Sequence, residues 1–365
     1  MNKPIENEYI NSITPYIPGD FAIGNFNKVV KLSSNENLLG PSKNAINAYL
    51  DCHKKLHIYP DSNCLDLKKA LAYHYNIDPT RIICEAGSEP IINLITKVFC
   101  NIKDEVLYSQ YGYIAYKIAA ESVGAKPISC EEVNYTTSIE NILKNITNKT
   151  RIIFIANPNN PTGTKITISQ IKYLLSKIPK NILLVIDEAY AEYNTDANYQ
   201  TALKLVNSGA ENVIVLHTFS KIYGLGALRV GWGYASSHII NTLDKLRGVF
   251  TVSTPAQAAA EAAIQDNYHI QKSIEHNNKW RTYLLREFQK LKINCLPSYG
   301  NFICVDFQTP KMVEEVDTLL RSNAIIPRTL KEYNLDQFLR ITIGLPEDCQ
   351  KVVQLIASII NNENY

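Results

Sequence analysis

Short apolar segments alternate with amphipathic segments through the middle of this 365-residue chain, and this alternation limits the fold more than any other feature. The apolar segments are four to six residues long and rich in isoleucine, leucine and valine, as is typical of strands buried on both faces. They comprise residues 81–84, 105–108, 151–156, 182–187, 213–216 and 231–234. The pattern predicts an α/β fold, in which a large, mainly parallel sheet is covered by helices on both faces.

The character of the chain changes near residue 266. A helix through residues 280–285, strands at 302–305 and 339–343 and two further helices predict a smaller α+β domain. We therefore expect three parts: an N-terminal arm (1–30) that packs with the small domain, a large domain (31–265) and the small C-terminal domain (266–365).

Composition excludes several classes of protein. The formal net charge is only +2, so no strong field favours nucleic acid or an anionic membrane. The N-terminus lacks the apolar core of a signal peptide, and no segment approaches the roughly 18 apolar residues of a membrane span. The eight cysteines include no C-x-x-C pair, so we expect neither disulfides nor a metal site. These features predict a cytoplasmic protein.

Polar residues follow several of the predicted strands, where open α/β sheets bind ligands. Gly87 and Ser88 begin a predicted helix, whose free N–H groups suit a phosphate, although this segment taken alone is better explained as a simple helix cap. The loop at 157–163 contains two X-Pro steps, which present asparagine amides such as that of Asn160. Asp187 ends an apolar strand, where a buried carboxylate needs a cation or several donors unless it only caps a helix.

The segment around Lys221 carries the most chemistry. A lysine amine reacts with a carbonyl when its pKa is lowered by burial, whereas a surface lysine would do nothing. The hydroxyls of Thr218 and Ser220 and the guanidinium of Arg229 are suitable donors for a phosphate. Together with the carboxylate of Asp187, these groups require a flat, phosphorylated carbonyl compound with a protonated ring nitrogen. Pyridoxal 5′-phosphate has all these features.

The chain resembles the fold-type I aminotransferases over nearly its whole length, and among them most of all the histidinol-phosphate aminotransferases. The resemblance is carried by residues 15–19 (PYIPG), 32–37 (LSSNEN), 159–163 (NNPTG), 187–190 (DEAY), 218–221 (TFSK) and 339–342 (LRIT). It implies a seven-stranded large sheet, pyridoxal phosphate as the cofactor and a transaminase reaction.

The resemblance also implies roles for individual positions. Lys221 becomes the Schiff-base lysine and proton shuttle, Asp187 the partner of the ring nitrogen, and Tyr111 the residue that stacks on the ring. Asn160 and Tyr190 are expected at the phenolic oxygen. The expected phosphate ligands are Thr218, Ser220, Arg229 and the backbone of Gly87 and Ser88.

Tyr59 is expected to reach the phosphate from a second subunit, so the resemblance implies a homodimer with shared sites. For the substrate it implies two arginines of the small domain, Arg328 and Arg340, because each can hold a phosphate through two hydrogen bonds. Surface ion pairing remains an alternative for Arg328. Tyr16 and Asn35 are expected to contribute from the N-terminal region, and Asn301 is a weaker candidate.

Several positions depart from the pattern of these enzymes. Glu89-Pro90 replaces an acidic pair, Gly226-Ala227 inverts an Ala-Gly pair, and His217 stands where an arginine is frequent. Two further departures are Leu38 and Ile58. None removes a group that the chemistry requires, but several border the substrate.

The expected reaction is transamination of L-histidinol phosphate with 2-oxoglutarate, giving imidazole-acetol phosphate and glutamate in histidine biosynthesis. Two alternatives share the fold: an aromatic amino-acid aminotransferase and a threonine-phosphate decarboxylase. A cofactor-binding module without catalysis is a third, but the sequence contains no appended DNA-binding segment.

Overall fold

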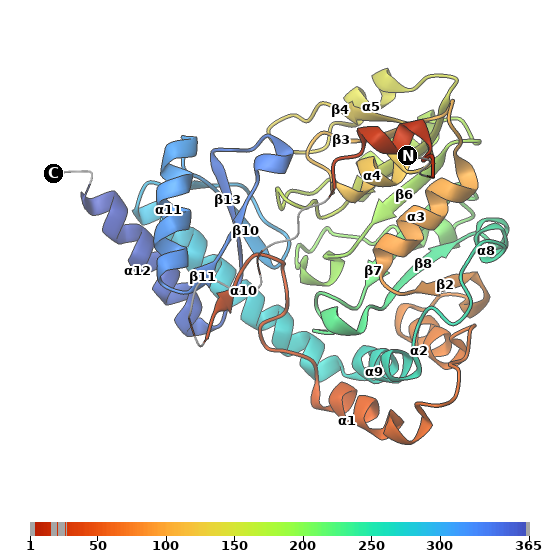
Figure 1. Cartoon of the computed structure of the whole chain (residues 1–365), viewed down its shortest axis with the longest axis horizontal. Helices are drawn as coiled ribbons and strands as arrows, with labels where there is room; N and C mark the ends of the chain where they lie inside the picture. The colour runs from red at the N-terminus through yellow and green to blue at the C-terminus, as the bar shows by residue number, and fades with distance from the viewer. Residues whose placement is uncertain (1–3, 16–19, 21–25, 27, 363–365) are drawn as a thin grey trace.

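A computed structural model describes residues 4–15, 20, 26 and 28–362 of the chain. A large sheet with its covering helices forms one part of the molecule, and a smaller sheet packed on three helices forms the other (Figure 1). The long helix α10 (Asn267–Lys290) follows α9 (Thr254–Gln265) and runs along the small sheet.

The large sheet has seven strands in the order β2-β8-β7-β6-β5-β3-β4. The five strands β7, β6, β5, β3 and β4 pair in parallel with one another in that order. Strand β8 is antiparallel to both of its neighbours, β2 and β7. The bounds are β2 (Ile82–Glu85), β3 (Glu105–Ser109), β4 (Lys126–Cys130), β5 (Thr150–Ala156), β6 (Leu183–Asp187), β7 (Val213–Thr218) and β8 (Gly231–Ala235). This mainly parallel sheet confirms the expected fold class.

Successive side chains of the central strands pack into two different hydrophobic cores, one on each face of the sheet, because side chains alternate between the faces of a sheet. In β5, Ile153 and Ile155 lie in one buried cluster, and Ile152 and Phe154 lie in the other. The helices that cover the large sheet are α2 (Leu65–Tyr75), α3 (Ser88–Phe99), α4 (Ala115–Glu121), α5 (Ile139–Asn145), α6 (Ile168–Lys177), α7 (Leu203–Asn207), α8 (Ser237–Asp244) and α9. Burial on both faces is why these strands read as continuous apolar runs.

The small sheet is antiparallel, in the order β12-β13-β10-β9. Its strands are β9 (Asn294–Cys295), β10 (Phe302–Asp306), β12 (Arg328–Thr329) and β13 (Phe338–Thr342), and it packs with α10, α11 (Pro310–Ser322) and α12 (Pro346–Asn362). A separate parallel pair joins β1 (Val30–Lys31) to β11 (Ile325–Ile326). Strand β1 therefore belongs to the part of the molecule that contains the small sheet, and the chain continues from there into the part that contains the large sheet.

The sequence did not predict α1 (Lys43–Asp51), β4, α5, α7 or α8. Helix α1 is short and buries only Ala45, and its apolar residues Ile46, Tyr49 and Leu50 are exposed on the described chain. Strand β4 lies at the sheet edge with partly exposed residues and a proline, which weakens its pattern. The division of the chain at residues 30 and 265 stays a prediction.

Candidate active site

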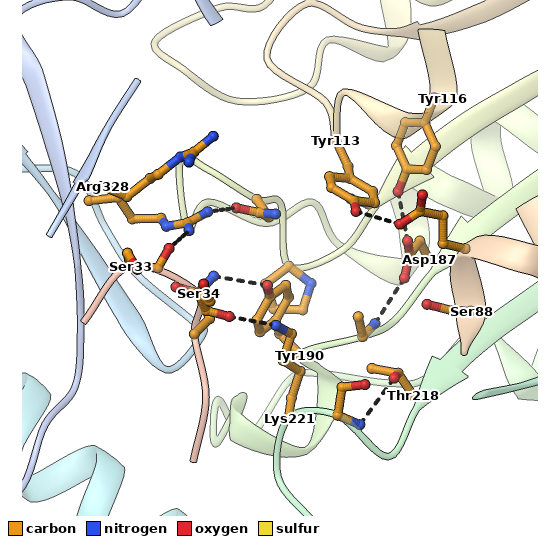
Figure 2. Close-up of a pocket in the computed structure, with 18 of the residues that line it drawn as sticks. Ser33, Ser34, Ser88, Tyr113, Tyr116, Asp187, Tyr190, Thr218, Lys221 and Arg328 are labelled. Carbon is orange, nitrogen blue, oxygen red and sulfur yellow. Dashed lines mark hydrogen bonds between the residues drawn. The ribbon is translucent and has the colours of Figure 1, made fainter. Parts of the chain in front are cut away.

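The predicted site residues gather in one cavity of about 170 Å³, next to the carboxyl ends of β5, β6 and β7. Figure 2 shows Tyr190 and Lys221 between Asp187, Ser88 and Thr218 on one side and Ser33, Ser34 and Arg328 on the other. The residues that were predicted from the sequence and line the cavity are Asn35, Ser88, Asn160, Asp187, Tyr190, Thr218, Ser220, Lys221, Arg229, Arg328 and Arg340. Residues from both parts of the molecule therefore meet around one lysine.

Lys221 lies just beyond β7, with its ammonium group facing the cavity. Its Nζ donates a hydrogen bond of 2.9 Å to the backbone carbonyl of Ser34 and lies 5.6 Å from the centre of the Tyr190 ring. Removal from bulk water, together with repulsion by Arg340, lowers the pKa of Lys221 to about 7. A substantial fraction of this amine is therefore neutral, and so nucleophilic and able to accept a proton, at neutral pH.

Asp187 is the last residue of β6 and is only 6% exposed. Its carboxylate accepts hydrogen bonds from the hydroxyl of Tyr116 at 2.8 Å and from the backbone N–H of Ala189 at 3.1 Å. Burial raises the pKa of Asp187, and these two donors and the nearby His217 oppose the rise. A cation bound in the cavity beside this carboxylate would relieve the cost of burying it.

The part of the cavity wall that contains Ser88 and Thr218 offers donors to an anion. Helix α3 begins at Ser88, and the hydroxyls of Thr218 and Ser220 lie on the same side as Arg229. The Nη1 of Arg229 donates to the hydroxyl oxygen of Ser220 at 2.9 Å, which aligns the guanidinium along this wall. Gly87 has a φ of +110°, and a Cβ built there would lie 2.6 Å from the Nη2 of Arg229. Only glycine leaves room for the guanidinium at the helix start.

A chain of hydrogen bonds joins the N-terminal segment to both sheets. The amide nitrogen of Asn35 donates to the hydroxyl of Tyr190 at 2.9 Å, and the backbone N–H of Asn35 donates to Thr342 at 3.0 Å. Arg340 donates to the side-chain oxygen of Asn160 and, at 2.6 Å, to the backbone carbonyl of Ser33. These contacts fix the segment at 33–35 across the cavity.

The two arginines of the small sheet have different partners. Arg340 is 7% exposed and forms no ion pair among the described residues, and its Nε has no hydrogen-bond partner there. Arg328 instead forms an ion pair with Glu332, in which Nε and Nη2 both donate to Oε1. The predicted alternative of ion pairing for Arg328 is therefore observed, but at the cavity wall and not on a remote surface.

Some predicted residues do not line the cavity. Tyr111 packs beside Tyr135, with ring centres 5.8 Å apart, whereas Tyr113 and Tyr116 line the cavity wall. Tyr59 is 79% exposed and stacks on Phe250. Gly87 lies next to the guanidinium of Arg229. The side-chain amide of Asn301 donates a hydrogen bond of 3.0 Å to the backbone carbonyl of Asn35. Tyr16 lies outside the described residues.

Sequence reasoning missed the groups that surround Asp187. Tyr116 comes from α4 and gave no sequence signal beyond the need of a buried carboxylate for donors. His217, noted from the sequence only as a departure, is 1% exposed and stacks on Trp232 with ring centres 4.5 Å apart. Its Nε2 lies 3.3 Å from Glu188 and its Nδ1 lies 3.4 Å from Glu192.

The surroundings of His217 favour the charged imidazolium. Burial alone would lower the pKa of His217, but its contacts with the carboxylates of Glu188 and Glu192 outweigh burial and raise the pKa to about 9. The hydroxyl of Tyr75 also donates to Glu192, at 2.9 Å. A buried cation thus lies behind the cavity, one residue before Thr218 and close to Asp187.

In the part of the chain that the structure describes, no helix is both long and apolar enough to cross a membrane. The same residues include no group of three or more histidine, cysteine, aspartate or glutamate side chains placed to hold a metal ion.

Comparison with known proteins agrees with this geometry. The family described as aminotransferase class I and II matches residues 27–356. A protein named histidinol-phosphate aminotransferase from Rhodopseudomonas palustris (strain BisB5) is 40% identical over 97% of this chain and 98% of its own length. One of the same name from Paramagnetospirillum magneticum is 39% identical over 99% of both chains.

Solved structures share the fold. The histidinol-phosphate aminotransferase of Sinorhizobium meliloti, solved in complex with pyridoxal 5′-phosphate, superimposes with a TM-score of 0.90 at 23% identity and covers 98% of each chain. A single mutant of Thermus thermophilus aspartate aminotransferase superimposes with a TM-score of 0.84 at 15% identity, covering 98% of this chain and all of that one. At these identities the likeness concerns the fold alone.

Proposed function

The chain belongs to the aminotransferase class I and II family, and we propose that it transfers the amino group of L-histidinol phosphate to 2-oxoglutarate with pyridoxal 5′-phosphate as cofactor. The products in this direction are imidazole-acetol phosphate and glutamate, and the reverse direction supplies histidinol phosphate for histidine biosynthesis. The observation that carries the proposal is the presence of Arg328 and Arg340 on the wall of the cavity that contains Lys221. The full-length relatives named histidinol-phosphate aminotransferase support the choice of substrate.

The donor set of the cavity fits the cofactor. The phosphate would be held by Ser88 at the start of α3, by the hydroxyls of Thr218 and Ser220 and by Arg229. Because Gly87 has no side chain, there is space for the guanidinium of Arg229 beside it. Asp187 would hold the ring nitrogen in its protonated form, and Tyr190 with Asn160 would face the ring oxygen. When bound, pyridoxal phosphate supplies an aldehyde for the amino group and a ring that accepts the electron pair left by the departing proton. The stacking role expected of Tyr111 stays a prediction.

Lys221 would perform the proton transfer. Its Nζ, with a pKa of about 7, can accept the proton from the Cα of the amino substrate and return it. The carbonyl of Ser34 accepts a hydrogen bond from this nitrogen and so keeps it on the cavity side. Arg340 would receive the anionic group of the substrate, because its buried charge has no carboxylate partner among the described residues.

We also propose that the enzyme is a homodimer. Apolar side chains are exposed on α1, the following turn and the segment before α9, which is unusual for a surface that stays in water. The exposed side chains in these segments are Ile46, Tyr49, Leu50, Leu56, Ile58, Tyr59, Leu246, Val249 and Phe250. A second subunit would cover them and allow Tyr59 to act in the partner's site. Sedimentation of the holoenzyme at the mass of one chain would contradict this part of the proposal.

One experiment separates this function from its rivals. The purified protein is loaded with cofactor and glutamate and then offered imidazole-acetol phosphate, phenylpyruvate or no acceptor, with phosphothreonine as a separate substrate. We expect the highest kcat/KM with imidazole-acetol phosphate. An equal or higher value with phenylpyruvate would favour an aromatic aminotransferase, and release of carbon dioxide from phosphothreonine would favour a decarboxylase.

A further inference from the structure

The cavity must accept two anions of different charge if the proposed function is correct, and this inference rests on that function. Glutamate carries a carboxylate of charge −1 on the carbon that bears its amino group, where histidinol phosphate carries a phosphate ester on a CH2 group. The second carboxylate of glutamate lies at the end of its side chain, where histidinol phosphate has its imidazole. A phosphate monoester carries roughly −1.5 to −2 at neutral pH. One arginine balances the carboxylate, whereas the phosphate gains from two.

The structure supplies one unpaired and one paired arginine for this purpose. Arg340 is buried and, among the residues that the structure describes, donates only to the neutral oxygens of Asn160 and Ser33, so its charge is available to either substrate. Arg328 is held by the carboxylate of Glu332, and both residues line the cavity. An anion that recruits Arg328 must therefore compete with a carboxylate that is already in place.

We propose that Glu332 is a specificity-determining residue, which weakens the binding of phosphate substrates relative to that of carboxylate substrates by competing for Arg328. The phosphate needs Arg328 and must displace Glu332 or share the guanidinium with it. The carboxylate of glutamate needs only Arg340 and leaves the ion pair intact. Glu332 thus reduces the difference in affinity between histidinol phosphate and glutamate, which bind alternately in the same cavity.

The test compares the holoenzyme with its Glu332→Gln variant, which keeps the shape of the side chain and removes its charge. Binding of histidinol phosphate and of glutamate is followed through the cofactor absorbance. We expect the Kd of histidinol phosphate to fall about two- to fivefold, the range for a partly exposed ion pair, while that of glutamate changes by less than about 1.5-fold. Glu315→Gln is a matched control, because Glu315 pairs with Lys311 at the same spacing, outside the cavity.

A second variant separates competition from positioning. In an Arg328→Ala background, Glu332→Gln should no longer tighten histidinol phosphate, because the group for which the two anions compete is gone. If Glu332 only orients Arg328, then Glu332→Gln will weaken phosphate binding, and that result overturns the inference. An equal change for both substrates overturns it as well.

Failure of the proposed function would be recognised separately. If the wild-type enzyme reacts with glutamate but not with histidinol phosphate, inhibition of the glutamate half-reaction by glycerol phosphate still reports on the competition. Glu332→Gln should lower that inhibition constant two- to fivefold. An unchanged constant would overturn the role of Glu332 irrespective of the natural substrate.

Discussion

The Nζ of Lys221 donates a hydrogen bond to the backbone carbonyl of Ser34, a residue 187 positions earlier in the chain. The contact joins the end of β7 to the segment that enters from the parallel pair β1–β11. The reactive amine is therefore oriented by backbone from a distant part of the chain, and its behaviour leads to the first two predictions.

Replacing Lys221 by alanine should abolish proton transfer while leaving the fold intact. General acid–base groups typically contribute about 10²- to 10⁴-fold, so we expect the rate of the glutamate half-reaction to fall by at least about 10²-fold. Stopped-flow absorbance of the cofactor measures this rate, and near-ultraviolet circular dichroism checks the fold. Lys180→Ala, at an exposed lysine, is the control. A Lys221→Ala enzyme that works at the wild-type rate would remove Lys221 from the mechanism.

The lowered pKa of Lys221 should be visible in the cofactor-free protein. The neutral amine becomes the major form as the pH rises through about 7, so the rate of pyridoxal phosphate uptake should increase with a midpoint near pH 7. Arg340→Gln removes a repelling charge and should move this midpoint upward. A midpoint above pH 9 in the wild-type protein would show that the amine behaves like an ordinary surface lysine.

The cluster of His217, Glu188 and Glu192 should make stability depend on pH. Because the folded-state pKa of His217 is raised to about 9, its stabilisation is fully present below about pH 6.5 and is lost as the pH rises through 9. The shift corresponds to about 3 kcal/mol at most. Urea unfolding at pH 6, 8 and 10 measures the change.

His217→Gln should lower the free energy of unfolding at pH 7 by about 3 kcal/mol, because the buried carboxylate of Glu188 and the half-buried carboxylate of Glu192 lose their cation. The same substitution should also remove most of the pH dependence of the free energy of unfolding between pH 7 and 9. His238→Gln, at an exposed histidine, should do neither. If the wild-type and His217→Gln proteins lose stability in parallel over this range, the imidazole does not carry the charge.

Gly87→Ala should weaken the phosphate end of the site. The new methyl group would lie 2.6 Å from the Nη2 of Arg229 and displace the guanidinium, so we expect cofactor affinity to fall by about tenfold, as for one lost charged hydrogen bond. Gly209→Ala is the matched control, because Gly209 also has a positive φ, +95°, but nothing lies within 4 Å of its Cβ position. Equal losses of affinity in both variants would assign the effect to backbone strain alone.

Local sequence patterns determined much of this molecule. The central strands were predicted because parallel strands buried on both faces leave no polar residues to interrupt the apolar run. The same reasoning located Asp187 and the segment at 218–221, because polar residues that end such strands must lie at one edge of the sheet. Helix α1 was missed although Ile46, Tyr49 and Leu50 recur at helical spacing, whereas strand β4 is partly exposed and lacks a strong apolar pattern.

The contacts between distant residues depended on the tertiary structure. No local pattern pairs Tyr116 with Asp187, or Arg340 with Asn160, because those neighbours arise only when strands and helices take their places in space. The ion pair between Arg328 and Glu332 also depended on the tertiary structure. Their spacing of four residues does not predict that both side chains face the cavity. The sequence by itself determined the central strands and many of the polar groups that line the cavity, such as Asp187 and Lys221, because residue types and strand ends are local properties. The tertiary structure decided their partners and pKa values, because burial and charge proximity depend on the whole packed chain.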